Sequence, residues 1–210
     1  MRIVCISDTH CKHWQIPLPD GDILIHSGDF TNSGNEKQIV DFNNWLGVIK
    51  PRYKHIILIA GNHDNLFVNN PIYARKLITN ATYIEEELIT IEGLKIYGTP
   101  VIPRYQYRNN AFGLVRGSIE MSQARSNIPS NLDILISHAP PYSILDSKNG
   151  KHYGCDSLLR KLCQDPPKIL CSGHIHEGYG LYQTEQTTFI NASILDSEHI
   201  ITNNPIILDI

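Results

Sequence analysis

The chain has 210 residues, of which 41% are hydrophobic, 8% aromatic and 19% charged, a composition that is typical of a folded globular domain and excludes disordered, fibrous and low-complexity polypeptides. Its 18 Lys and Arg against 21 Asp and Glu give a formal net charge of −3, which argues against a long nucleic acid or an anionic membrane as a partner. The chain also holds ten histidines, and imidazole is the commonest metal ligand in proteins.

The length and the cysteines indicate a single cytoplasmic domain. At about 100 to 200 residues per domain, we expect one domain over residues 1–210 that folds without disulfides. The five cysteines are odd in number and form no Cys-x-x-Cys pair, and the N-terminus lacks the apolar stretch of a signal peptide. No apolar run approaches the roughly 20 residues of a membrane-spanning helix. We therefore expect a reducing cytoplasm and no membrane contact.

Short apolar runs rich in Ile, Val and Leu predict five buried strands, because they are too short for helices and rich in β-branched residues. The runs cover residues 3–6, 23–25, 56–60, 134–136 and 169–171. Between the second and third runs, the spacing of Ile39, Phe42 and Trp45 predicts a helix over residues 36–49. Ser33 and Glu36 are expected to form its capping box.

The rest of the chain completes a mixed pattern. Further helices are expected at residues 71–79 and 156–163, a hairpin at 88–91 and 94–97, and tail strands at 188–191 and 206–209. Residues 99–131 have weak periodicity, which predicts a long functional excursion or rim loop. Alternating strands and helices indicate an α/β (mixed α+β) architecture, in which helices cover a central sheet or a pair of sheets.

Each of the five apolar runs leads directly into side chains that can bind metal. In an α/β sheet, sites form beyond the carboxyl ends of the strands, so clusters that are distant in sequence can meet there. In chain order the clusters are Asp8-Thr9-His10, Gly28-Asp29, Gly61-Asn62-His63-Asp64, Ser137-His138 and Gly173-His174-Ile175-His176. We expect the glycines to turn the backbone sharply off each strand.

The candidate ligands are too many for one tetrahedral ion. If the backbone stays extended, each two-residue step sends both polar side chains of a pair to one face and turns Thr9 and Ile175 away. Two ions that share a bridging carboxylate are the economical arrangement. The oxygen donors are Asp8, Asp29 and Asn62, and the imidazole donors are His10, His138, His174 and His176.

The five blocks, Asp-x-His, Gly-Asp, Gly-Asn-His-Asp, His and Gly-His-x-His, resemble those of the calcineurin-like metallophosphoesterase superfamily, in the same order. The segments around Asp8, Asp29 and His176, together with Ile190-Asn191-Ala192-Ser193, are similar to the metallophosphoesterase-domain-containing (239FB-like) branch of that superfamily. The resemblance implies a four-layer α/β/β/α sandwich of the metallo-dependent phosphatase type.

The resemblance also implies the roles of the site residues. One ion would be held by Asp8, His10, Asp29 and His176, and the other by Asp29, Asn62, His138 and His174, so that Asp29 bridges. A hydroxide between the ions would attack phosphorus. His63 would protonate the leaving oxygen, and Asp64 would orient His63 and raise its pKa. The mixed nitrogen and oxygen ligands suit Mn, Fe, Zn, Co or Ni, so the metal stays open.

The resemblance implies a phosphodiesterase that acts on small nucleotides such as cyclic nucleotides, so the expected partner is a small phosphoester. A protein or small-molecule phosphomonoesterase, and a regulatory or scaffold protein with little turnover, remain as alternatives. The acidic balance disfavours a nuclease. Arg104, Tyr105 and Asn109 are candidate substrate contacts. The histidines outside the motif blocks are read as structural or surface residues, namely His13, His26, His55, His152 and His199.

Overall fold

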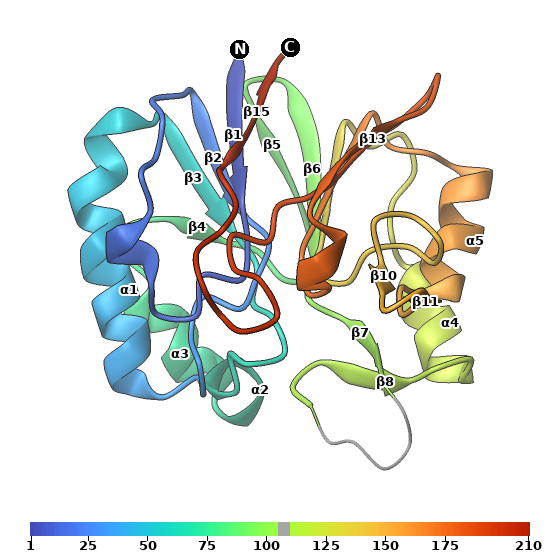
Figure 1. Cartoon of the computed structure of the whole chain (residues 1–210), viewed down its shortest axis with the longest axis horizontal. Coiled ribbons are helices and arrows are strands. Elements are labelled where there is room, and N and C mark those ends of the chain that lie inside the picture. Colours follow the sequence, from blue (N-terminus) through green and yellow to red (C-terminus); the bar gives the residue numbers. More distant parts are fainter. Residues whose placement is uncertain (105–109) are drawn as a thin grey trace.

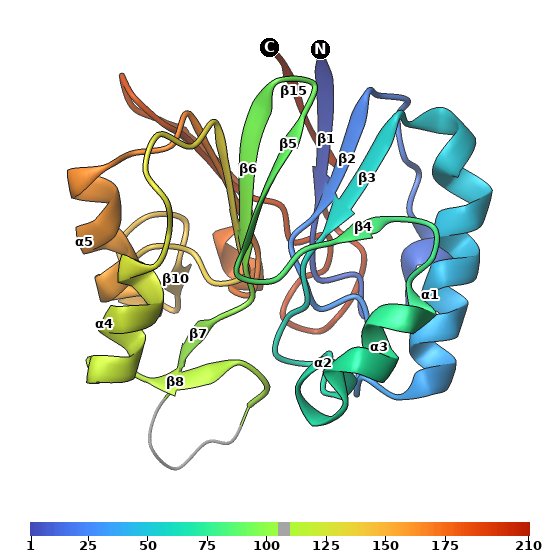
Figure 2. The same cartoon turned by 180° about the vertical axis from the view of Figure 1, so that it is seen from behind.

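The computed structural model describes residues 1–104 and 110–210. Two β-sheets face each other, and helices cover the outer face of each sheet (Figures 1 and 2). Parallel and antiparallel strands occur in both sheets. The layers therefore run helix, sheet, sheet, helix, and the predicted α/β/β/α sandwich is confirmed.

The first sheet has the strand order β15-β1-β2-β3-β4. β1 to β4 run parallel and β15 joins β1 in the antiparallel sense, which places the two chain ends side by side (Figure 1). Its strands are β1 (Arg2–Ile6), β2 (Ile23–His26), β3 (His55–Leu58), β4 (Thr82–Tyr83) and β15 (Ile206–Asp209).

The second sheet has the strand order β13-β14-β12-β9-β6-β5, with antiparallel strands at both edges. Its strands are β13 (Gly180–Gln183), β14 (Thr188–Asn191), β12 (Ile169–Ser172), β9 (Ile134–Ser137), β6 (Leu94–Thr99) and β5 (Glu87–Ile91). Two small ribbons lie outside the sheets and pair β7 (Ile102–Arg104) with β8 (Gly113–Val115) and β10 (Ser147–Lys148) with β11 (Lys151–His152).

Alternation along the strands divides the core into layers. In β1, Ile3 and Cys5 face the second sheet, whereas Val4 and Ile6 pack toward the outer helices of the first sheet. Cys5 meets Cys171 of β12 between the sheets, with 3.4 Å between their sulfur atoms. Both cysteines are fully buried and belong to the hydrophobic core between the sheets.

The first sheet is covered by α1 (Glu36–Ile49) and α3 (Pro71–Leu77), with the short α2 (Leu66–Asn69) beside them, and the second by α4 (Ile119–Ser126) and α5 (Asp156–Gln164). Single 3-10 turns lie at His13–Gln15, Lys50–Arg52 and His176–Gly178. Among the described residues, no helix is long and apolar enough to cross a membrane.

Two local predictions are wrong. The cap of α1 is Asn35, whose side chain accepts the Gln38 N–H at 3.1 Å, so Ser33 and Glu36 do not form a capping box. Residues 99–131 are not simply a rim loop, because the segment contains β7, β8 and α4. Helix α4 escaped prediction because it buries only Met121 and Arg125, which gives too weak an apolar stripe.

Candidate metal centre

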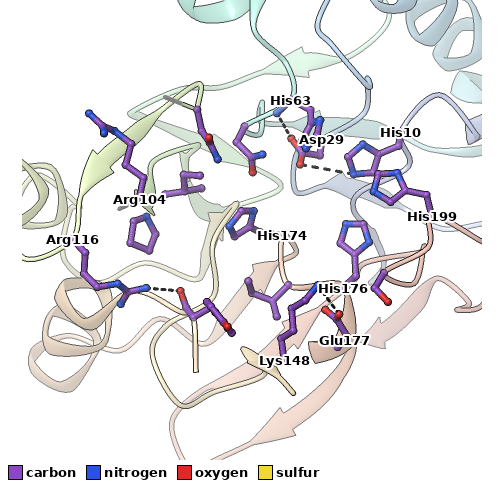
Figure 3. Close-up of a pocket in the computed structure, with 17 residues that line it drawn as sticks. His10, Asp29, His63, Arg104, Arg116, Lys148, His174, His176, Glu177 and His199 are labelled. Atoms are coloured by element: carbon purple, nitrogen blue, oxygen red, sulfur yellow. Dashed lines mark hydrogen bonds and ion pairs between the residues drawn. The ribbon is translucent and has the colours of Figure 1, made fainter. Parts of the chain in front are cut away.

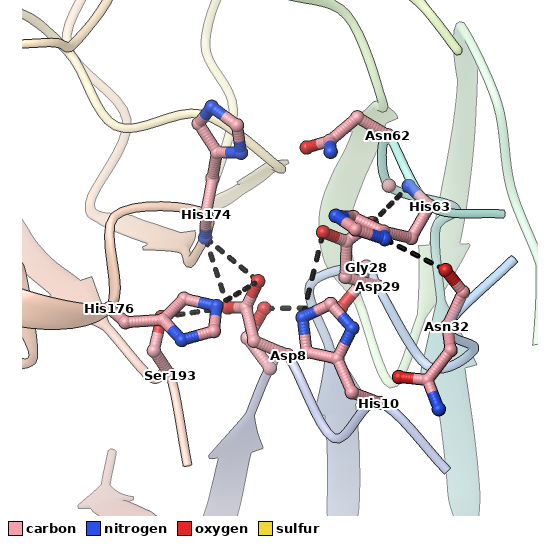
Figure 4. A network of polar contacts seen from close by, with 12 residues as sticks. Asp8, His10, Gly28, Asp29, Asn32, Asn62, His63, His174, His176 and Ser193 are labelled. Atoms are coloured by element: carbon pink, nitrogen blue, oxygen red, sulfur yellow. Dashed lines mark hydrogen bonds and ion pairs between the residues drawn. The ribbon is translucent and has the colours of Figure 1, made fainter. Parts of the chain in front are cut away.

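Five strands of the two sheets end at one edge of the sandwich, and their following residues meet there (Figure 4). The strands are β1, β2 and β3 of the first sheet and β9 and β12 of the second. Because parallel strands present their carboxyl ends to the same side, residues 166 positions apart, such as Asp8 and His174, are in hydrogen-bond contact. The structure thus brings all seven predicted ligands into one cluster.

The cluster divides into groups of side chains whose ligand atoms lie within 4.8 Å of one another. The groups are Asp8 with His10 and His176, His10 with Asp29 and His63, and Asp29 with His138 and His174. Asn62 adjoins the last group, since its Oδ1 lies 3.1 Å from Nε2 of His138. The first and last groups lie within the two expected ligand sets, one at each end of the cluster, whereas the middle group adds His63, which neither set includes.

Asp29 lies between the two ends. Its Oδ2 is 3.3 Å from Nε2 of His138 and 3.9 Å from Nε2 of His10. Its other oxygen accepts the backbone N–H of His63 at 2.7 Å, which fixes the carboxylate plane. One carboxylate oxygen therefore faces imidazoles from both ends, the position that a bridging ligand requires.

Asp8 is held by groups from the opposite sheet. Its Oδ1 lies 3.6 Å from Nε2 of His176. The backbone N–H of His174 donates to the carboxylate at 2.9 Å, and the Ser193 hydroxyl donates to Oδ2 at 2.7 Å. The fully buried Asp8 is thus fixed by these donors, and its Oδ1, which the His174 N–H also contacts at 3.1 Å, faces His176.

Backbone carbonyls orient most of the imidazoles. Nδ1 of His10 lies 3.2 Å from the Thr31 carbonyl oxygen. Nδ1 of His138 lies 2.8 Å from the Ser27 carbonyl oxygen, and Nδ1 of His176 lies 2.8 Å from that of Asp196. A carbonyl can only accept, so Nδ1 carries a proton in each ring and Nε2 faces the cluster, where the neutral imidazole would offer its lone pair to a metal ion. This arrangement is typical of histidines that bind metal.

The backbone reaches these positions through left-handed turns rather than extended chain. Asp8, His10, Asp29 and His174 have φ values of 55°, 40°, 55° and 67°. Such conformations are uncommon outside glycine and concentrate at functional sites. The backbone is therefore not extended at Asp8-x-His10, although both side chains still reach the cluster, and Ile175, which an extended chain would turn away, lines the cavity.

The three glycines serve the site in two ways. Gly28 has φ +106°, the sharp turn expected. Gly61 and Gly173 are needed for close approach instead, because a Cβ at either position would collide with a carboxylate oxygen, that of Asp29 or of Asp8 respectively. The backbones carrying the ligands therefore pack directly on the ligands of other strands.

The cluster pairs buried carboxylates with imidazoles. Burial disfavours the charged form of Asp8, but the contact with His176 lowers the pKa of Asp8 well below its ordinary value. Burial lowers the pKa of His10 to about 4. For His138, burial is outweighed by the Asp29 and Asp8 carboxylates, which raise its pKa to about 9. Two buried anions thus require compensating positive charge.

The residues fit divalent metal ions. The buried Nε2 of His10 has no hydrogen-bond partner among the described residues, although such an atom is costly to leave unpaired. The donors are imidazole nitrogens and carboxylate oxygens, the set that suits Mn, Fe, Zn, Co or Ni. Ions would neutralise the carboxylates and engage the unpaired nitrogen.

Asp64 does not pair with His63 as expected. Nδ1 of His63 lies 2.8 Å from the Asn32 carbonyl. The buried Asp64 carboxylate instead accepts the N–H groups of Asp29, Thr31 and Gly61 and the Thr31 hydroxyl at 2.7 to 3.0 Å. Asp64 therefore binds the loops after β2 and β3 together, and the predicted orientation of His63 by Asp64 is wrong.

A cavity of about 480 Å³ opens over the cluster (Figure 3). Arg104 lines it and donates Nε–H to the Gly113 carbonyl at 2.8 Å. The other two candidate substrate contacts, Tyr105 and Asn109, lie outside the described residues. Arg116 also lines the wall, together with side chains that were not selected from the sequence, namely Lys148, Tyr153, Ser197 and His199.

The sequence reading missed two residues of the site, Ser193 and His199. Ser193 lies in the segment Ile190-Asn191-Ala192-Ser193, which the sequence linked only to the family branch and not to the site. Its role depends on its contact with Asp8, which is 185 residues away in the chain. His199 follows no apolar run, so the strand-end pattern did not select it. Its ring lies 4.4 Å from that of His10. The only sequence feature that pointed to His199 was the high number of histidines in the chain.

The sequence of this chain matches a known protein family. The family model described as calcineurin-like phosphoesterase matches residues 1–178. The human protein "Metallophosphoesterase domain-containing protein 1" is 35% identical over 235 aligned residues, which cover 100% of this chain and 71% of the relative. A UPF0046 protein of Caenorhabditis elegans is 36% identical, with coverage of 100% and 81%.

Solved structures agree on the fold. The crystal structure of the Thermus thermophilus protein TT1561 superposes with a TM-score of 0.63 at 12% identity and covers 90% of this chain and 88% of that chain. At this identity the similarity concerns the fold alone.

Proposed function

The chain belongs to the calcineurin-like phosphoesterase family, and from that membership we propose that it is a dinuclear metal-dependent phosphodiesterase that acts on small nucleotides such as cyclic nucleotides. Family membership supports a phosphoric ester hydrolase in general. We propose in addition that the site holds two metal ions, that the bond cleaved is a phosphodiester and that the substrate is a nucleotide.

The observation that carries the proposal is the position of Asp29. A single carboxylate oxygen faces His10 on one side and His138 on the other, and each side has further ligands of its own. Asp8, His10, Asp29 and His176 would hold one ion, and Asp29, Asn62, His138 and His174 the other. When bound, two divalent ions activate water at neutral pH and neutralise charge on the phosphoryl group.

The protein's own side chains would then position the phosphoryl group and protonate the leaving oxygen. The carbonyl-bound imidazoles hold a fixed ring orientation, so the phosphoryl group meets a preorganised surface. Nδ1 of His63 is held by the Asn32 carbonyl, so Nε2 can donate a proton to the leaving oxygen when the ring enters the reaction as the imidazolium, protonated on both nitrogens. The backbone N–H of His63 meanwhile fixes Asp29, so one residue links the bridge to proton transfer.

The cavity supports an organic ester rather than free phosphate alone. Beyond the cluster its wall includes the apolar Ile102 and Pro103 and the ring of Tyr153, which can contact a sugar, base or other organic group. The formal net charge of the chain is −3, which favours a small phosphoester over a long nucleic acid. The complete ligand set argues against a scaffold without turnover.

The odd number of cysteines without a Cys-x-x-Cys pair supports a reducing compartment such as the cytoplasm. The Cys5 and Cys171 sulfur atoms, 3.4 Å apart in the core, are in contact as thiols.

The test is hydrolysis of a chromogenic phosphodiester and of its matched monoester by EDTA-stripped protein, before and after addition of Mn²⁺. We expect diester hydrolysis that Mn²⁺ restores and that Asp29→Ala abolishes, with two ions per wild-type chain. The control is Glu185→Ala, at an exposed residue in the turn between β13 and β14, and it should behave as wild type.

A preference for the monoester would replace the proposal with a phosphomonoesterase. Bound ions without hydrolysis of either ester would favour a regulatory or scaffold role. Near-normal activity in folded Asp29→Ala would overturn the bridging role of this residue.

A further inference from the structure

His199 lies against the metal-ligand cluster although it belongs to none of the five sequence blocks. Its ring centroid is 4.4 Å from that of His10 and 5.3 Å from that of His176, and its side chain lines the cavity (Figure 3). The family model ends at residue 178, so this histidine comes from a part of the chain that the model does not cover.

The turn that carries His199 is built to hold it there. The Asp196 carboxylate accepts the N–H groups of Glu198 and Ile200, both at 2.9 Å, and the Asp196 carbonyl accepts the His199 N–H at 3.0 Å. The Lys12 ammonium donates to the His199 carbonyl and ties the turn to the loop after β1. His199 itself has φ 59°, an uncommon conformation that persists only where surrounding contacts impose it.

The ring nitrogens of His199 remain available to a ligand. In His10, His138 and His176 a backbone carbonyl occupies Nδ1. No residue within 1–104 or 110–210 forms a hydrogen bond with either ring nitrogen of His199. The ring is half-buried and is oriented by its contact with the His10 ring. A neutral imidazole in this place presents one N–H and one lone pair to the cavity.

Resting on the proposed phosphoesterase function, we propose that His199 is an additional substrate-binding residue whose ring N–H donates to an oxygen of the phosphoryl group. The phosphoryl group must lie over Asp29 to reach both ends of the cluster. His199 lies at the end that contains His10 and His176, so its ring borders that position. Its contact adds to those of the ligand residues and requires no metal bond to His199.

The experiment measures binding of orthophosphate to Mn²⁺-loaded protein by calorimetry, which needs no turnover. We expect His199→Ala and His199→Phe to weaken orthophosphate binding about 10- to 100-fold, the effect of losing one hydrogen bond to a charged acceptor. His199→Phe keeps a ring against His10 and removes only the donor, whereas His199→Gln restores a donor and should recover part of the affinity. Bound Mn²⁺ should equal that of wild type in all three variants.

The control is His55→Ala, a histidine at the opposite end of the sheet that pairs with Glu92, and it should bind orthophosphate as wild type does. Unchanged affinity in His199→Phe would overturn the inference, as would wild-type protein that binds no orthophosphate. Loss of Mn²⁺ from His199→Ala would also overturn it, because His199 would then be a metal ligand. Wild-type protein that binds orthophosphate but hydrolyses no ester would reject the proposed function alone.

Discussion

The carboxylate of Asp64 accepts the backbone N–H of Asp29 at 3.0 Å, across two loops of the first sheet. The same oxygen accepts the Gly61 N–H at 2.7 Å, and the other accepts the Thr31 N–H at 3.0 Å. A buried side chain that follows β3 thereby fixes the backbone of the central carboxylate, which follows β2. The position of Asp29 between the two ligand groups depends on this contact.

Replacing Asp64 by Ala should therefore destabilise the protein rather than alter proton transfer. The change leaves three buried N–H groups without an acceptor, and we expect a loss of about 3 to 5 kcal/mol in the free energy of unfolding. Urea unfolding of the metal-stripped protein measures this loss. Asp64→Asn keeps one acceptor oxygen and should lose less, whereas Glu185→Ala, at an exposed turn residue, should lose under about 1 kcal/mol. Unchanged stability with an altered pH profile of turnover would instead assign Asp64 to catalysis.

Ser193 is expected to tune metal affinity without touching metal. Its hydroxyl donates to Asp8 Oδ2 at 2.7 Å, and removal of such a supporting hydrogen bond typically costs 10- to 100-fold in metal affinity. Ser193→Ala should show this loss in a Mn²⁺ titration against a competing chelator. Ser172→Ala is the matched control, because its buried hydroxyl bonds the Ile190 carbonyl instead. Equal affinities in the two variants would contradict the role of Ser193.

His26 should make stability depend on pH. Its Nδ1 accepts the Gly28 N–H at 3.2 Å, so a proton there has no acceptor, and burial lowers its pKa from 6.5 to about 3. Below pH 6.5 the His26 side chain is therefore protonated in the unfolded chain but stays neutral in the folded chain. Stability is full above pH 6.5 and falls as the pH drops toward 3, by about 2 kcal/mol at pH 5.

Substitution of His26 by Gln removes this titration. Between pH 7.5 and pH 5, the unfolding free energy of metal-stripped wild type should fall by about 2 kcal/mol more than that of His26→Gln. Chemical denaturation at both pH values measures the difference. Parallel losses in the two proteins would show that His26 does not resist protonation in the fold.

Most of the fold and the clustering of the candidate ligands could be predicted because both are encoded locally. Each run of β-branched residues is short enough to be a strand, and its polar successors follow at once, as Asp29 follows the run at residues 23–25. The parallel order of the strands then places these successors at one edge. The same sequence pattern, an apolar run followed directly by polar residues, thus predicted both the strand ends and the positions of the candidate ligands.

The contacts that the sequence did not reveal are tertiary. Asp64 and His63 are neighbours in the chain, yet the turn sends Asp64 inward to the loop after β2 and His63 toward the Asn32 carbonyl. Ser193 and His199 act on groups in the first sheet from the far end of the chain. No periodicity or spacing encodes these pairings, because they arise only when the two sheets pack.

His63→Ala gives the sharpest separation between metal binding and proton transfer. The His63 backbone, not its side chain, holds Asp29 Oδ1 at 2.7 Å, so the variant should keep wild-type metal content while kcat falls about 10²- to 10⁴-fold. The loss should be small for a diester with a nitrophenol leaving group and large for one with an alkyl alcohol, since only the latter needs protonation. Metal analysis and kcat for both esters provide the measurement. A loss of metal would place His63 among the ligands, and equal losses for both esters would exclude it as the proton donor.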